Sequence, residues 1–172
     1  MMDLFVQGVR RLSTLCGIVA VVLLLAAVLV VCQLVFVRYV LGTSAIWQHE
    51  FVTYSLVAAT FLGSPYVLLT RGHVNVDLLP HYLGPRGKLV MALLASGLSL
   101  AFCGIIGWTS ISWWHEAYVN NWRGETVWAP RLWIPWAAMP LGIGLLSLQY
   151  LADIAALLSG RALPFSGQEV PK

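Results

Sequence analysis

Four long uncharged stretches dominate the pattern of hydrophobic and polar positions. Each is long enough to cross a membrane, because twenty residues of α-helix rise about 30 Å, the thickness of the hydrocarbon core of a bilayer. The run 21–31 is apolar on every side, whereas a β-barrel strand alternates in polarity. The pattern therefore predicts an all-α integral membrane protein with one membrane domain, 1–172. The expected spans are about 12–37, 51–70, 89–114 and 132–158, joined by loops 38–50, 71–88 and 115–131.

Composition and charge place this domain in the bilayer and orient it. The chain is 59% hydrophobic and 10% charged, with a mean hydropathy of +0.81, which excludes an ordinary soluble domain. A net charge of +3 gives no reason to expect a nucleic-acid partner. Since Lys and Arg concentrate in cytoplasmic loops, their distribution predicts that both termini lie in the cytoplasm. The cytoplasmic set is Arg10, Arg11, Arg71, Arg86, Lys88, Arg161 and Lys172, and the opposite set is Arg38, Arg123 and Arg131.

The second stretch is bracketed by polar groups at both ends. Glu50 opens it and is expected to pair with Arg38, which ends the first span on the same side; a proton-relay role for Glu50 is the alternative. Arg71, His73 and Asp77 follow the stretch in the predicted inner loop. They form either a solvated turn or a contact with a partner subunit.

All eight tryptophans map to the outer half of this topology. They are Trp47, Trp108, Trp113, Trp114, Trp122, Trp128, Trp133 and Trp136. Indole rings favour the headgroup level, so an interfacial belt accounts for most of them. Aromatic side chains are also favoured anchors in protein contacts, and a docking surface is therefore the second interpretation.

Small residues and prolines predict how the helices pack. Ala59 and Gly63 form a short strip in the second span that would let another helix approach closely. A longer strip in the third span recurs every four residues, at Ala95, Ser99, Cys103 and Gly107. Three prolines five residues apart, Pro130, Pro135 and Pro140, predict a bent outer half of the fourth span. No second repeat with a matching break is visible, so a broken transporter helix is the weaker interpretation.

Candidate chemistry is sparse. The three cysteines fall inside spans without Cys-x-x-Cys spacing, which predicts packing residues and no metal or redox site. His49 and His115 near the outer face raise the hypothesis of a haem-binding membrane anchor, although both lie outside their apolar runs. A small stand-alone exporter is the other alternative. Such a protein needs an acidic residue deep in a span, and Asp153 lies only near the inner end of the fourth.

Several motifs together resemble the small membrane subunit of tripartite ATP-independent periplasmic (TRAP) transporters. The matching segments, in order, are Arg38-Tyr39-Val40-Leu41-Gly42, Trp47-x-x-Glu50, Phe61-Leu62-Gly63, Arg71-Gly72-His73-Val74-Asn75-Val76-Asp77, Ile134-Pro135, Met139-Pro140-Leu141-Gly142 and Leu148-Gln149. The resemblance extends from about Arg10 to Leu158. The density of tryptophan between Trp108 and Trp136 departs from the pattern of that family.

The resemblance implies a non-catalytic subunit of a secondary transporter in a bacterial or archaeal cytoplasmic (inner) membrane. A periplasmic solute-binding protein captures an organic acid or similar solute, and a large TRAP membrane subunit carries it inward, with sodium coupling in that subunit. This chain would hold no cofactor or metal and would scaffold the large subunit. Candidates for orienting the first hairpin or contacting that subunit are Arg38, Trp47, Glu50, Gly63, Arg71, His73 and Asp77. Candidates for docking the binding protein are Trp114, Trp122 and Arg123.

Overall fold

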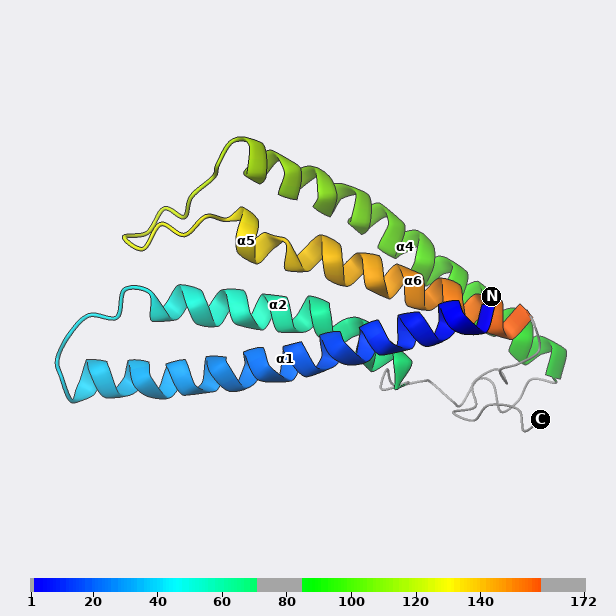
Figure 1. Ribbon diagram of the computed structural model, residues 1–172, viewed down its shortest axis with the longest axis horizontal. Helices are drawn as coiled ribbons and strands as arrows, with labels where there is room; N and C mark the ends of the chain where they lie inside the picture. The colour runs from blue at the N-terminus through cyan, green and yellow to red at the C-terminus, as the bar shows by residue number, and fades with distance from the viewer. Residues whose placement is uncertain (1, 71–84, 159–172) are drawn as a thin grey trace.

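The computed structural model describes residues 2–70 and 85–158, most of which form helices. Four of the helices are long and apolar enough to cross a membrane, which confirms the predicted four-span, all-α fold. In chain order the helices are α1 (Met2–Tyr39), α2 (Gln48–Leu69), α4 (Pro85–Val119), α5 (Trp133–Trp136) and α6 (Ala138–Leu158) (Figure 1).

The helices extend beyond the predicted spans at several ends. α1 contains 38 residues, a length of about 57 Å at 1.5 Å per residue, and continues through Arg10 and Arg11 to Met2. α2 begins at Gln48 instead of Phe51, and α4 continues to Val119. A helix can continue beyond the hydrocarbon core because its backbone hydrogen bonds are internal. Outside the core it can also contain polar residues, so the end of an apolar run does not mark the end of the helix. The loops 40–47 and 120–132 are correspondingly short.

The four spanning helices form a layer instead of a closed bundle (Figure 1). α2 packs against both α1 and α6, whereas α4 contacts α6 and α5 but neither α1 nor α2. The two hairpins, α1–α2 and α4–α6, converge at one end and diverge at the other, which carries the loops 40–47 and 120–132 (Figure 1). We call the latter the tryptophan-rich end. The N-terminal end of α1 and the C-terminal end of α6 lie at the opposite end (Figure 1).

Small residues form the contact between α1 and α2. The most buried positions of α1 recur at intervals of three, four or seven residues, as a helix–helix seam requires: Val9, Ser13, Gly17, Ala20 and Ala27. A Cβ atom placed on Gly17 would lie 2.5 Å from the Tyr66 ring, and one on Gly63 would lie 3.4 Å from the Ala20 Cβ. The predicted strip of Ala59 and Gly63 therefore belongs to a close internal helix pair.

The strip predicted in the third span packs against α6 through its outer half only. Cys103 is buried, and a Cβ on Gly107 would lie 3.5 Å from Cγ2 of Ile143 in α6. Ala95, at the inner end of the strip, is exposed. Because an α-helix has 3.6 residues per turn, a row spaced by four residues rotates away from a straight contact face.

The predicted irregularity of the fourth span is confirmed. The helix is divided into α5, which ends at Trp136, and α6, which begins at Ala138. Pro140 has no backbone N–H to donate to the carbonyl of Trp136, four residues earlier, so the hydrogen-bond ladder is interrupted there. Pro135 lies inside α5 itself.

Candidate interaction sites at the tryptophan-rich end

Trp47 connects the start of α2 with the loop 120–132. It precedes the first residue of α2 and makes no side-chain capping hydrogen bond. Its ring lies edge-on to Phe51, with a centroid distance of 6.1 Å, and 6.4 Å from the ring of Trp128. Trp47 is thus a contact between the two hairpins.

The carboxylate of Glu50 is shielded from solvent and lacks a partner. Both of its oxygens are buried, and neither forms a hydrogen bond within the described part of the chain. The ion pair expected with Arg38 is absent, so that expectation is wrong. Arg38 instead lies exposed in the last turn of α1, where the helix dipole favours a cation. Glu50 faces the other hairpin: a Cβ on Gly124 would lie 3.6 Å from Glu50 Oε2.

A second acceptor at the start of α2 is also buried. Gln48 is 5% exposed, and its Oε1 atom has no hydrogen-bond partner among residues 2–70 and 85–158. Buried polar atoms are paired in the great majority of cases, so an unpaired one requires a specific explanation. The beginning of α2 is therefore the most unusual polar environment of the described chain.

The loop 120–132 is folded back on itself. Arg123 and Arg131 form an isolated antiparallel bridge, and the backbone N–H of Gly124 donates to the carbonyl of Pro130 at 3.0 Å. Asn121 and Ala129 adopt positive φ angles of 52° and 41°. This tight geometry places both arginine side chains on the exposed surface.

The aromatic residues of α4 and α5 bind mainly to one another. Trp114 is half-buried, donates its Nε1–H to the carbonyl of Trp133 at 3.0 Å and stacks on Tyr118 with a centroid distance of 5.8 Å. Trp122 lies edge-on to Trp136 at 6.1 Å and keeps 37% of its surface exposed. Of the predicted docking residues, Trp122 and Arg123 are exposed, whereas Trp114 is half-buried and contacts α5.

A polar contact that sequence reasoning missed lies toward the opposite end. The Ser13 hydroxyl donates to Gln149 Oε1 at 3.2 Å, and Gln149 Nε2 donates to Asp153 Oδ1 at 3.2 Å. Ser13 and Gln149 are almost completely buried, so this chain of hydrogen bonds joins α1 to α6. The four-residue spacing of Gln149 and Asp153, in an otherwise apolar helix, was the available signal.

The remaining predicted residues divide into two groups. Arg71, His73 and Asp77 lie outside the described residues. His49 and His115 are both exposed, on α2 and α4, two helices that do not contact each other. The structure therefore does not bring together the histidine pair on which the haem hypothesis depended.

Comparison with known proteins identifies the family. Residues 27–160 match the DctQ component of the tripartite ATP-independent periplasmic transporters. The chain belongs to this family. It is a multi-pass protein of the inner membrane and a transporter component, not an enzyme.

A curated relative agrees with this assignment. The chain is similar to the C4-dicarboxylate TRAP transporter small permease protein DctQ of Vibrio cholerae serotype O1, with 22% identity over 148 residues. That match covers 74% of this chain and 64% of the relative, which is less than two thirds of the relative's length. No solved structure matches the chain.

Proposed function

We propose that this chain is the small, non-catalytic membrane subunit of a TRAP-type secondary transporter. It scaffolds a large membrane subunit, which carries an organic acid or similar solute delivered by a periplasmic solute-binding protein. The match of residues 27–160 to the DctQ family carries this proposal. The relative from Vibrio cholerae is named for C4-dicarboxylates, which makes dicarboxylates the first solutes to test.

The layered fold supports a scaffolding role. Of the most hydrophobic window of each span, only 11% to 28% is buried inside the chain, so most of each helix faces outward. The outward side chains are large and apolar, for example Leu29 on α1 and Leu98 on α4, which are 69% and 72% exposed. Such surfaces fit lipid or another membrane protein, and they offer no polar path for a solute.

We assign the residues at the tryptophan-rich end to assembly and docking. Trp47 and Gly63 fix the α1–α2 hairpin and its junction with the other hairpin, while Trp122 and Arg123 offer an exposed aromatic and cationic surface. Arg38, Glu50, Arg71, His73 and Asp77 complete the proposed contacts with partner subunits. Positive charge in the segment 71–88 and at both ends of the chain supports an orientation with the tryptophan-rich end in the periplasm.

Co-purification and reconstituted uptake test the proposal. A tagged chain should retain a much larger polytopic protein, and uptake of a dicarboxylate into proteoliposomes should require both membrane proteins and a soluble binding protein. The sodium gradient should act through the large subunit, with no cofactor on this chain. Transport by this chain alone would instead support an exporter and contradict the proposal.

Residue-level tests separate assembly from docking. Replacing Glu50 by Gln and Arg71 by Ala should alter membrane assembly or uptake, and unchanged values for both would refute their assignment. Trp122→Ala should reduce uptake while the complex of the two membrane subunits stays intact. Trp108→Ala is the matched control, because Trp108 is 77% exposed and lies away from the loop 120–132.

A further inference from the structure

Arg123 and Arg131 lie directly opposite each other in the loop 120–132, and we call them the arginine pair. They form the isolated antiparallel bridge of this loop. The two backbone hydrogen bonds of the bridge, each 3.0 Å long, join the residues on either side of the arginines. This pattern defines a non-hydrogen-bonded pair, the type in which opposite side chains are closest. The two Cβ atoms of such a pair lie on one face, about 4.5–5.5 Å apart.

The arginine pair lies on one face of the bridge, and Glu50 lies on the other. Consecutive residues of an extended segment point to opposite faces. A Cβ on Gly124 would lie 3.0 Å from Pro130 Cδ and 3.6 Å from Glu50 Oε2. Gly124 and Pro130 therefore share the face toward α2, and the arginines point away from the Glu50 carboxylate. Both arginines are exposed.

The arginine pair has no counter-ion within the described part of the chain. Neither guanidinium forms an ion pair or a hydrogen bond there, although the exposed Glu125 lies two residues after Arg123. Like charges directly opposite each other destabilise a β-ladder, so the pair opposes the folding of its own loop. A ligand with negative charge would offset this repulsion. Arginine suits carboxylates in particular, because its planar fork donates two parallel hydrogen bonds to them.

Aromatic contacts hold the pair in a fixed position. Trp122, next to Arg123, lies edge-on to Trp136 at 6.1 Å, and Trp128 lies 6.4 Å from Trp47 of the other hairpin. A preorganised pair of charges favours a partner with a surface of its own, since little entropy is lost on binding. A lipid phosphate needs no such arrangement, because single long side chains at the headgroup level reach it by bending.

We propose that the arginine pair binds acidic side chains on the surface of the periplasmic solute-binding protein. The inference rests on the proposed function and names the chemistry of its docking surface, to which it adds Arg131. Charge complementarity selects the partner, since a positive patch attracts an acidic surface and repels a basic one. Exposed charges of this kind act mainly on the rate of association and on the orientation of the encounter.

The experiment measures the affinity and association rate of the purified binding protein for the complete membrane complex in nanodiscs. The double variant Arg123→Gln/Arg131→Gln removes both charges and keeps long polar side chains. We expect docking about tenfold weaker, mainly through slower association, with a shallower dependence on salt concentration, because two charge pairs are lost. Arg11→Gln is the matched control: Arg11 is an exposed arginine near the opposite end of the molecule, and its replacement should leave docking unchanged.

A single charge reversal, Arg131→Glu, separates docking from a structural role. It replaces two like charges by a cross-strand ion pair, so the variant should unfold at the same or a higher temperature than the parent while docking weakens. A lower unfolding temperature would overturn the inference and assign the arginines to the folding of the loop.

The remaining outcomes identify other partners. Unchanged docking of the double variant would overturn the inference and leave the arginine pair to lipid phosphates. Release of the large subunit from either variant would also overturn it and assign the pair to contact between the membrane subunits. If the parent complex binds no soluble protein at all, the proposed function itself fails.

Discussion

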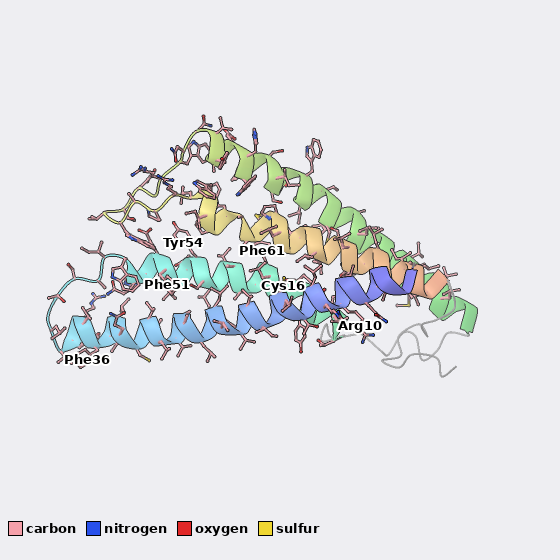
Figure 2. The ribbon with its side chains drawn as sticks, in the orientation of Figure 1. Arg10, Cys16, Phe36, Phe51, Tyr54 and Phe61 are labelled. Carbon is pink, nitrogen blue, oxygen red and sulfur yellow. The ribbon has the colours of Figure 1, made fainter. Side chains whose placement is uncertain are left out.

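Gly142 lies at a close approach of α2 and α6, which makes Gly142→Ala an informative packing mutation. A Cβ atom at this position would overlap the backbone carbonyl of Phe61 and lie 2.9 Å from the Phe61 Cβ. Phe61 lies between the two helices (Figure 2). Carbonyl atoms of a helix cannot rotate aside as a flexible side chain can, so the two helices must separate.

The distance sets the expected size of the effect. Ordinary contacts of a Cβ atom begin near 3.4 Å. The helices must therefore move apart by about 0.5 to 1 Å, and a gap of this size removes roughly a quarter to a half of the dispersion attraction across it. Overpacking of this kind typically destabilises by about 1–3 kcal/mol, and the better helix propensity of alanine offsets about 1 kcal/mol. We expect the free energy of unfolding to fall by up to about 2 kcal/mol.

Gly144→Ala is the matched control, because a Cβ at Gly144 has no neighbour within 4 Å. It changes helix propensity in the same way, two residues further along α6, and should leave stability unchanged or raise it by up to about 1 kcal/mol. Unfolding in mixed micelles with increasing SDS, followed by tryptophan fluorescence, compares the two variants. If Gly142→Ala is as stable as Gly144→Ala, the close α2–α6 approach does not exist and the layered arrangement is wrong.

Two further predictions use the same unfolding assay. Gln149→Leu removes the acceptor of the buried Ser13 hydroxyl and should reduce stability by about 1 kcal/mol, and parental stability would contradict the α1–α6 polar contact. Trp114→Phe deletes the N–H that donates to the carbonyl of Trp133 and should cost about 1 kcal/mol. Trp108→Phe should leave stability unchanged, because that ring is 77% exposed. Equal losses of stability in Trp114→Phe and Trp108→Phe would contradict a contribution of the hydrogen bond and assign both effects to the position of the indole rings at the membrane interface.

The four spans could be predicted from the sequence because the bilayer imposes length and apolarity on any helix that crosses it. The helix ends could not, since α1 continues through Arg10 and Arg11 once it leaves the hydrocarbon. The division of the last span could also be predicted, because Pro140 removes a specific backbone donor.

The sequence indicated which residues belong to the candidate site but not which of them contact one another. Glu50 and Arg38 flank one short loop, so an ion pair was the natural expectation. In the structure Glu50 faces Gly124, which is 74 positions away in sequence, and Trp47 contacts Trp128. Contacts between hairpins depend on how helices pack, and apolar helices carry little polarity pattern to indicate which face turns inward.

The small residues supply the missing pattern and explain why the fold is a layer. Lipid tails are as apolar as leucine, so a large apolar side chain gains no hydrophobic free energy by facing another helix instead of lipid. The buried positions of α1 are instead mostly small, such as Ser13, Gly17 and Ala20, while the large residues point outward. Each hairpin therefore closes along a narrow strip, and α4 meets neither α1 nor α2. Besides the contacts of α6 with α1 and α2 and of α5 with α2, the first hairpin meets the loop 120–132 of the second through Trp47 and Glu50. A partner bound at this end would therefore fix the angle between the two hairpins.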